Sequence, residues 1–515
     1  MDKSSRALKY TGIILYTLLF TIPLLVTLSS ADLQSLKESV TNPYYIHILS
    51  FTYKQALLSA LLSLIVGLPG AYIITYRNFH FKRFVKTLFT IPFVLPPILV
   101  VLGFVIFYGN SGYLNRILMA VFGLEEAPLR ILYSFKTVLL AHTFYNFPIV
   151  ITMVGNSMRK IDHSCEEAAV AEGASSLRVF SRIILPRIIP AAASAAIIVF
   201  LYCFTSFSII LVLGGGPSLT TLEVEIYRQA KTSSNIEMAA ALSILSTLTV
   251  LIVLFANSFI ENRSSVFEAD YTDFRTQKPS APERIYLIAA ILFVLLPLVS
   301  IFIKAGSIKA WQSALSTIES ALNSVKVALL SSLVSTALAL STAYLLSSSA
   351  GKKQGLLTSY CTLPMVTSSV IAGLSYYVTV RKFFFIPSPV LLILSHAVLA
   401  MPFCIRSIRS VWKDIPTEII ESARSTGATE RQIFYKIQLP ILRPAVRSSL
   451  MFSFAISMGE LNSTMILAGS SFRTIPLQIY RMVGSYNYEG ACALGVVLCL
   501  ICFLAFSFIS KDDYI

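Results

Sequence analysis

The chain has 515 residues, of which 55% are hydrophobic and only 13% are charged, and its mean hydropathy is +0.74. One soluble core does not need so large an apolar fraction, so the composition excludes an ordinary soluble domain and indicates that lipid surrounds most of the chain. The net charge of +15 would indicate a nucleic-acid partner in a soluble protein, but in a membrane protein its meaning depends on which loops carry it.

Apolar runs of about 18 residues or more, long enough to cross the hydrocarbon core as helices, recur along the sequence, and we predict twelve of them. The six in the first half are Tyr10–Ser30, Thr52–Tyr76, Lys86–Phe107, Lys136–Met158, Ala191–Leu213 and Ile236–Ile260. The six in the second half are Ile285–Ile303, Ser324–Leu346, Leu356–Val380, Val390–Val411, Ser448–Leu467 and Ala491–Ile509. The first run is too long for a signal-peptide core and has a poor cleavage site, so we keep it as a span. We therefore predict an all-α integral membrane fold.

Basic residues lie mainly on alternate loops between these spans. They follow the second, fourth, sixth, eighth and tenth spans, in Arg77–Lys86, Arg159–Arg187, Arg263–Arg284, Lys352–Lys353 and Arg406–Arg447. By the positive-inside rule, these loops and both termini are predicted to be cytoplasmic. The exceptions, which fall on the outside, are Lys304, Lys309, Arg381, Lys382, Arg473 and Arg481.

The sequence contains a long internal repeat. At a shift of 254 residues the matching pairs are His142/His396, Pro148/Pro402, Glu167/Glu421, Ala169/Ala423, Gly173/Gly427, Phe180/Phe434, Ile183/Ile437, Leu185/Leu439, Pro186/Pro440 and Pro190/Pro444. Upstream the shift becomes 272, which aligns Tyr72 with Tyr344 and Pro92 with Pro364. The difference is absorbed in the outside loop after the third span, at Tyr108–Phe135, where changes of length are tolerated.

Each repeat holds six spans, an even number, so both enter the bilayer in the same sense and form a parallel rather than an inverted repeat. The predicted organisation is a first transmembrane half at residues 1–261, a polar cytoplasmic linker at 262–283 and a second transmembrane half at 284–515. A pore with approximate two-fold symmetry follows from this arrangement.

The best matched parts of the repeat are two long cytoplasmic loops, at residues 159–190 and 413–444. A simple connection between two helices needs only a few residues, whereas these loops contain helix-forming segments bounded by prolines. In the first loop the pattern is Glu167-Ala168-Ala169, then Gly173, then Ile183, Leu185 and Pro186. In the second loop Glu421-Ser422-Ala423, Gly427, Ile437, Leu439 and Pro440 reproduce every spacing.

This pattern resembles the EAA loop of the permeases of binding-protein-dependent ABC importers, and it occurs once in each half. The resemblance implies the type I permease fold of such importers, and it implies that each loop docks into a groove on an ATPase subunit. A helix faced with alanine and ended by glycine lets another backbone approach closely, and glycine can adopt the left-handed conformation that ends a helix. The carboxylates of Glu167 and Glu421 are placed to cap a helix or to pair with a partner. The alternative is an ordinary amphipathic helix on the bilayer surface, which predicts neither the duplicated spacing nor the central glycine.

The sequence shows no site for nucleotide or metal chemistry. It contains no G-x-x-x-x-G-K-[ST] phosphate loop, so ATP hydrolysis must come from another polypeptide. The seven cysteines lie mostly in spans or cytoplasmic loops, which argues against a disulfide framework or a zinc site. We therefore predict a non-catalytic subunit without metal or bound cofactor. Its expected partners are two copies of an ATPase that uses ATP and Mg, a soluble or tethered substrate-binding protein and membrane lipid, with no nucleic acid.

Charged side chains within spans are costly, so those present are candidates for function. Glu460 lies in the fifth span of the second half, beside Asn462, and its partner in the repeat is Ser206. We predict that these three residues border the translocation pathway, the alternative being that Glu460 only bonds neighbouring helices. The duplication of His142 and His396 favours a packing or hydrogen-bonding role for both over substrate binding.

The transported solute is harder to predict. Fused two-half permeases of this kind resemble those for thiamine and for ferric iron, and more distantly those for sulfate and phosphonates. The segments Cys203–Phe207, Leu213–Pro217 and Thr220–Glu223 are similar to the corresponding stretch of thiamine permeases, which favours thiamine or a related compound. A secondary transporter with parallel repeats is the alternative of another class, although such a carrier has no need of two matched cytoplasmic loops. The direction of transport, import into the cell across the inner membrane, is likewise implied by the resemblance.

Overall fold

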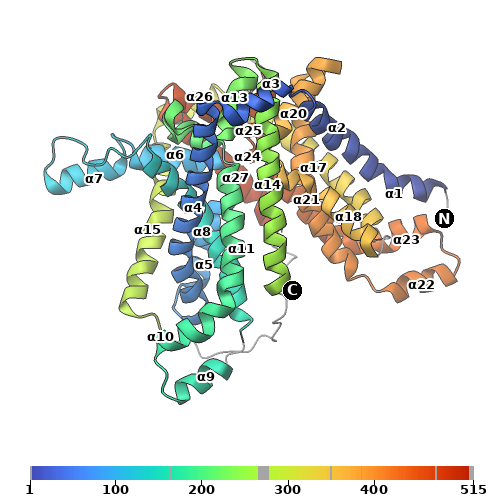
Figure 1. Ribbon diagram of the computed structural model, residues 1–515, viewed down its shortest axis with the longest axis horizontal. Helices are drawn as coiled ribbons and strands as arrows, with labels where there is room; N and C mark the ends of the chain where they lie inside the picture. The colour runs from blue at the N-terminus through green and yellow to red at the C-terminus, as the bar shows by residue number, and fades with distance from the viewer. Residues whose placement is uncertain are drawn as a thin grey trace. The chain divides into compact units, whose positions relative to one another are not determined.

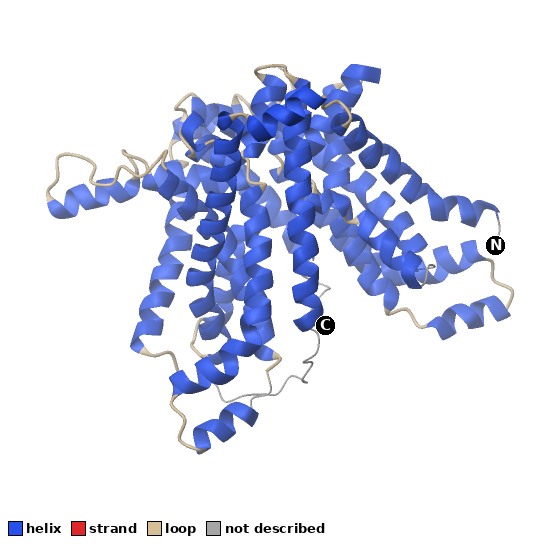
Figure 2. Cartoon of the chain, viewed as in Figure 1, coloured by secondary structure: helices blue, strands red, loops and turns tan. Residues whose placement is uncertain are grey.

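The computed structural model describes residues 3–161, 164–264, 278–347, 351–383, 386–469 and 472–509. Throughout these ranges the regular secondary structure is helical, as Figure 2 shows. Ten helices are long and apolar enough to cross a membrane within this part of the chain, or eleven if the bent pair Gln354–Met365 and Ser369–Phe383 counts as one span. The predicted all-α membrane fold is confirmed. The predicted span Ser448–Leu467 is not among the ten: it is divided between two helices, and the longer one carries two arginines and four serines, which make it less apolar.

The chain folds into two compact units that exchange segments between the sequential halves. Unit 2 comprises Val40–Val224 and Leu248–Ile303, and unit 1 comprises Met1–Ser39, Glu225–Thr247 and Lys304–Ile515, each without the gaps named above. The first predicted span therefore belongs with helices of the second half, and the seventh belongs with helices of the first half. The division into residues 1–261, 262–283 and 284–515 remains a prediction about the repeat, and most of its linker, residues 265–277, lies outside the described residues.

Unit 2 is built around helices that run alongside one another in Figure 1. Its elements are α4 (Pro43–Tyr76), α5 (Lys82–Val94), α6 (Pro97–Tyr108), α7 (Tyr113–Phe122), α8 (Phe135–Arg159), α9 (Ser164–Ala171), α10 (Ser176–Val179), the π-helical turn η2 (Phe180–Ile184), α11 (Leu185–Phe204), α12 (Ser208–Leu213), η3 (Pro217–Leu219) and α15 (Ala281–Lys304). The long helix α4 starts where proline and a capping side chain coincide: Asn42 accepts a hydrogen bond from the Tyr44 backbone N–H at 2.9 Å, and Pro43 occupies the first turn. Glycines on α4 and α6 let neighbours approach, since Gly67 lies against α8 and Gly103 lies against Pro297 of α15.

Unit 1 has the corresponding set of helices. Its elements are α1 (Lys3–Tyr16), η1 (Thr17–Thr21), α2 (Ile22–Leu28), α3 (Leu33–Thr41), α16 (Ile308–Leu315), α17 (Ile318–Ser347), α18 (Gly351–Cys361), α19 (Leu363–Val366), α20 (Ser369–Phe383), α21 (Ser388–Lys413), α22 (Thr417–Ser425), α23 (Glu430–Ile433), η4 (Phe434–Gln438), α24 (Leu439–Gly459), α25 (Asn462–Leu467), α26 (Ile475–Gly484) and α27 (Tyr488–Ile509). Helices α13 (Leu222–Lys231) and α14 (Ile236–Ser264) contribute residues to both units. The N-terminal helix is held by Tyr16, whose hydroxyl donates to the Tyr360 carbonyl oxygen at 2.8 Å.

The repeat seen in the sequence is reproduced element by element. Shifted by 254 residues, the bounds of α10, η2 and α12 coincide with those of α23, η4 and α25. Shifted by 272 residues, the break after α5 at Leu95 coincides with the break after α19 at Thr367, and both residues have extended backbone conformations. The same irregularities therefore recur in both halves. Irregular backbone inside a membrane protein is tolerated only where the surrounding protein satisfies it.

Candidate functional site

The first of the two matched loops, residues 159–190, contains a short helix that ends at a glycine. Helix α9 carries Glu167, Ala168 and Ala169, although the Glu167 side chain lies outside what the structure describes. Gly173 has φ +84°, and the Ala174 backbone N–H donates to the Ala169 carbonyl at 2.9 Å. This left-handed residue with a six-to-one hydrogen bond is the Schellman arrangement, which satisfies carbonyl groups that the helix end leaves free.

The second loop has the same geometry. Helix α22 carries Glu421, Ser422 and Ala423, and Gly427 also has φ +84°. The Ala428 backbone N–H donates to the Ala423 carbonyl at 3.0 Å. A Cβ atom added at Gly173 or Gly427 would meet no other atom within 4 Å, so both helix ends face open space.

Apolar side chains on both loop helices are exposed. Val170 on α9 is 59% exposed and Ile419 on α22 is 44% exposed, and α22 contains no buried residue. Figure 1 shows α9 and α10 at one end of unit 2, beyond the long helices. Short helices with exposed apolar residues and close-approach glycines form a surface that suits contact with another protein.

The second loop carries an internal clip that the first lacks. Arg424 at the end of α22 pairs with Glu430 at the start of α23, with 2.8 Å between Nε and Oε1. The hydrogen bond to Glu430 raises the pKa of the Arg424 guanidinium above its usual range. Thr429 and Gln432 add a capping box at the start of α23. The positions of Arg424 and Glu430 are Val170 and Ser176 in the first loop, so this ion pair has no counterpart there.

Each loop returns to the membrane through a π-helical turn followed by proline. The Leu185 backbone N–H donates to the Phe180 carbonyl, and Leu439 repeats this bond with Phe434. Pro186 and Pro440 come next, in the first turn of α11 and of α24. Since proline donates no backbone hydrogen bond and clashes with the carbonyl four residues earlier, a wider turn at this point relieves the clash. The predicted residues Leu185, Pro186, Leu439 and Pro440 therefore set how each loop joins its span.

Aromatic side chains connect each π-helical turn to the end of the second span of its half. In unit 2 the Phe180 ring lies edge-on to Tyr72 of α4, with 5.9 Å between ring centroids. In unit 1 the Phe434 ring lies 5.5 Å from Tyr344 of α17, and Trp412 packs against both. Each loop is therefore in direct contact with the end of a spanning helix.

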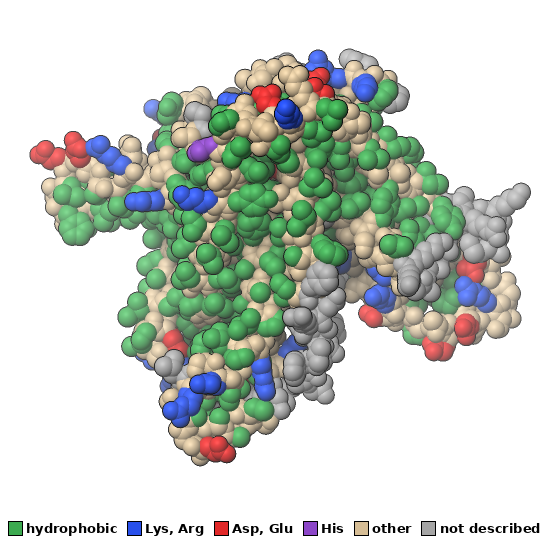
Figure 3. Space-filling view, in the orientation of Figure 1, with side chains coloured by type: hydrophobic (Ala, Val, Ile, Leu, Met, Phe, Trp, Pro, Cys, Tyr) green, Lys and Arg blue, Asp and Glu red, His purple; other side chains and the backbone are tan. Residues whose placement is uncertain are grey.

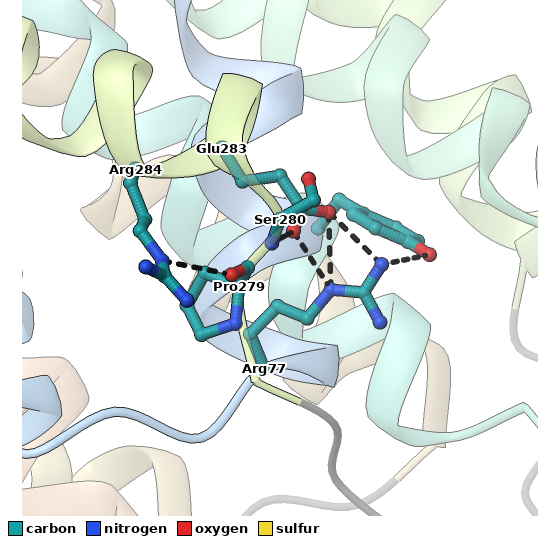
Figure 4. Close-up of polar contacts among 6 residues, drawn as sticks. Arg77, Pro279, Ser280, Glu283 and Arg284 are labelled. Carbon is teal, nitrogen blue, oxygen red and sulfur yellow. Dashed lines mark hydrogen bonds and ion pairs between the residues drawn. The ribbon is translucent and has the colours of Figure 1, made fainter.

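The end of α4 is tied to the start of α15 by polar contacts, shown in Figure 4. Arg77, directly after α4, forms an ion pair with Glu283 of α15, with 2.9 Å between Nη2 and Oε1. Its guanidinium also lies over the Tyr72 ring at 5.3 Å. The Glu283 carboxylate accepts the Ser280 backbone N–H at 2.7 Å, and both partners of the ion pair are largely buried. One residue before Arg77, the Tyr76 hydroxyl donates to Glu166 of α9 at 3.0 Å.

The fifth span of each half is interrupted, and the predicted pathway residues lie at the interruptions. Ser206 lies between α11 and α12, and Glu460 lies between α24 and α25, with Asn462 as the first residue of α25. Glu460 Oε1 accepts the Ser463 backbone N–H at 3.0 Å, which caps α25. Asn462 Nδ2 donates to Ser369 of α20 at 2.9 Å. All three predicted side chains are partly exposed, and whether they face a pathway remains a prediction.

The two repeated histidines bridge spans within each unit. His142 of α8 contacts Ser206 at 2.9 Å through Nε2 and Ser59 of α4 at 3.2 Å through Nδ1. His396 of α21 contacts Ser457 of α24 at 2.8 Å through Nδ1. These hydrogen bonds agree with the bonding role expected for both histidines. They also fix the position of the interrupted fifth span.

Comparison with known proteins identifies the family. The family described as binding-protein-dependent transport system inner membrane component matches residues 59–266 and again residues 285–511. The chain belongs to this family. It is therefore a multi-pass inner-membrane permease, a non-catalytic component of a transport system, with two copies of the family region fused in one polypeptide.

Several curated relatives match this chain over most of their own length. The permease is 27% identical to the thiamine transport system permease protein ThiP of Haemophilus influenzae over 91% of this chain and 89% of that protein. It is 23% identical to ThiP of Escherichia coli over the same shares of both chains. A probable sulfate transport system permease protein, cysT of Prototheca wickerhamii, is 29% identical over 47% of this chain and 95% of its own length.

Sequence reasoning missed the contacts that join the permease loops to its spans. Tyr72, Phe180 and their repeat partners were visible as matched positions, but their contact depends on how α4 and α11 pack. The Arg77–Glu283 ion pair joins residues 206 apart in sequence, and Arg77 was interpreted only as part of a basic loop.

Proposed function

We propose that this permease forms the pore of an ATP-driven importer and carries thiamine or a related compound delivered by a substrate-binding protein. The observation that carries the proposal is the similarity to ThiP proteins over about nine-tenths of both chains. The duplicated cytoplasmic loops support the coupling to ATP, because they are surfaces for which a self-contained carrier has no use. Both termini lie in the cytoplasm in this proposal, as the distribution of basic residues predicts.

Two copies of an ATPase subunit are the proposed partners of the loops. One copy would contact Glu167, Ala168, Ala169 and Gly173, and the other would contact Glu421, Ser422, Ala423 and Gly427. The open space beside both glycines supports this assignment. ATP and Mg would be bound by these subunits, and closure of the ATPase pair would draw the two loops together. Through the Tyr72–Phe180 and Tyr344–Phe434 contacts, that movement would reach the spans and open the pore outward.

Ser206, Glu460 and Asn462 are the proposed pathway residues. The interruption of the fifth span at equivalent places supports this assignment, because broken helices expose backbone groups where a solute can bind. A carboxylate in the pathway also suits a cationic solute such as thiamine.

The second candidate cargo is ferric iron or an anion of the sulfate or phosphonate type. The similarity to cysT, which covers about half of this chain, supports an anion as a second candidate cargo. A secondary transporter with parallel repeats fits the span count but not the membership of a binding-protein-dependent family.

Reconstitution distinguishes these candidates. The permease would be placed in lipid nanodiscs with its ATPase and binding protein, and ATP hydrolysis would be measured with thiamine, ferric iron, sulfate or a phosphonate. Stimulation of ATP hydrolysis by thiamine alone would support the proposal. Stimulation by another solute would identify that solute as the cargo instead. Solute uptake into liposomes without any ATPase would overturn the coupling to ATP.

A further inference from the structure

The outer loop of the first half contains a helix with an exposed apolar face. Helix α7 lies in the segment Tyr108–Phe135, which is the extra length that the second half lacks. Val121 is 70% exposed and Phe122 is 68% exposed, and Ile117 one turn earlier is exposed as well. Ile117 and Val121 are four residues apart and therefore share one face of the helix, with Phe122 beside them. Large exposed apolar side chains gathered on one face indicate a contact surface.

This helix is held in a defined position. The Asn115 side chain is buried, and its Nδ2 donates to the carbonyl oxygens of Gly109 at 2.9 Å and Leu129 at 2.8 Å. Its Oδ1 accepts the Leu129 backbone N–H at 3.0 Å. The two ends of the insertion are thus fastened to each other through one amide group. Gly123, with φ +65°, ends the helix in the left-handed conformation.

The orientation of α7 within unit 2 indicates what covers its apolar face. By length and composition Pro97–Phe122 could cross a membrane, but Figure 1 shows α7 crosswise to α4 and α15 and at the end of unit 2 opposite α9. Figure 3 shows charged side chains on one edge of this projecting segment and apolar side chains on the other. The apolar edge lies on the side of the segment that faces the spans of unit 2 in this view. In the last turn of α15, Phe302 and Ile303 are exposed as well. Both α7 and α15 thus expose apolar side chains, as helices that share a lipid environment would.

We propose that α7 lies in the membrane interface, with Ile117, Val121 and Phe122 inserted at the boundary of headgroups and acyl chains. A helix in the interface plane buries its apolar face and leaves its polar face in water. A binding protein would arrive from the aqueous side, where the charged edge lies, so lipid fits the apolar edge better. Arg116 is the one basic residue within the helix, so the attachment comes from apolar burial rather than from attraction to anionic lipid.

Spin labels on the two faces of α7 test the proposal in the full chain. The exposed native Cys165 would first be replaced by serine, and a nitroxide would be attached to V121C, to F122C or to the control R116C on the opposite face. In phosphatidylcholine nanodiscs the collision of each label with oxygen, which concentrates in lipid, is compared with its collision with a water-soluble nickel chelate. We expect the oxygen-to-nickel ratio to be several-fold higher at positions 121 and 122 than at 116, and unchanged when phosphatidylserine is added.

Three outcomes would overturn the proposal. Equal ratios on both faces would place α7 in water, and a ratio that rises only with phosphatidylserine would mean electrostatic attachment. Protection of V121C and F122C only after addition of the binding protein would make the face a protein docking site. A further variant, Asn115→Ala, removes the clamp, and we expect it to reduce the difference between the two faces of α7 while the ATPase still co-purifies.

Discussion

Substitution of the two loop glycines distinguishes two possible roles for them: ending the loop helix, or letting the backbone of the ATPase approach closely. Gly173 and Gly427 both have φ +84°, and a Cβ at either position would enter open space. In the isolated permease the cost of Gly→Ala is therefore backbone strain alone, about 1–2 kcal/mol at each position. Asparagine tolerates the left-handed conformation better and should cost less, although its side chain is larger.

The two roles predict opposite orders of effect on ATPase affinity. If the glycines only end the helices, alanine should weaken binding more than asparagine, by about fivefold to thirtyfold per loop, the ratio that corresponds to 1–2 kcal/mol. If the ATPase backbone approaches the glycine closely, asparagine should weaken binding at least as much as alanine, because its side chain occupies the space that the partner needs. We expect the second order.

The assay is titration of nanodisc-embedded permease with labelled ATPase, for Gly173→Ala with Gly427→Ala and for the matching asparagine pair. Gly123 at the end of α7 supplies a matched control, because it too is left-handed with open space beside it but lies at the other end of unit 2. Substitution of Gly123 should leave the ATPase affinity unchanged. Wild-type affinity in the asparagine pair, with weakened binding in the alanine pair, would refute close approach and leave only the capping role.

Three further experiments test contacts elsewhere in the permease. A double-mutant cycle on Arg77→Met and Glu283→Gln should show a coupling energy of about 1.5–3 kcal/mol in thermal unfolding of the purified protein. The reason is that each single substitution removes a charged hydrogen bond and leaves its largely buried partner behind. A coupling energy near zero would show that the pair does not stabilise the linker end. His396→Phe removes the hydrogen bonds of the buried ring to the hydroxyl groups of Ser457 and Thr464, and it should cost about 1–3 kcal/mol, measured in the same way. An unchanged unfolding temperature would count against a bonding role. Glu460→Gln keeps an oxygen that can cap α25 through Ser463 but removes the charge. It should therefore lower thiamine-stimulated ATP hydrolysis without lowering stability. Unchanged transport and unchanged stimulation of ATP hydrolysis would eliminate the pathway role.

Much of the fold could be predicted because the repeat and the apolar runs are local signals. Twelve runs, their parity and the matched loops required only residue types and spacing. Glycine at the end of a predicted loop helix predicts a left-handed cap, and the structure has that conformation at Gly173 and Gly427. Site residues identified by the loop pattern remain predictions until an ATPase contact is measured.

The rest depends on packing between distant segments, which residue spacing does not encode. Nothing local indicates that the first span lies with second-half helices, since this depends on contacts such as that of Tyr16 with Tyr360. The interruption at Glu460 was likewise hidden, because an apolar run across Ser448–Leu467 is compatible with a continuous helix. Here the capping bond to Ser463 and the contact of Asn462 with Ser369 decide where the helix stops.

The two loops differ in how they are held, and this difference affects how one kind of ATPase can use both. In the first loop Glu166 accepts a hydrogen bond from Tyr76 at the end of α4, and the neighbouring Arg77 pairs with Glu283 of α15. The second is held within itself by Arg424 and Glu430 and packs against Trp412. An exposed ion pair such as Arg424–Glu430 contributes little energy, so the second loop is only weakly held by it. The first loop is bonded instead to the end of α4 through Glu166, so we expect it to follow that span more closely. Two identical ATPase subunits would then bind equivalent helix ends that are attached to their spans differently. Closure of the ATPase pair would therefore move the second loop relative to its own spans by more than it moves the first loop relative to its spans.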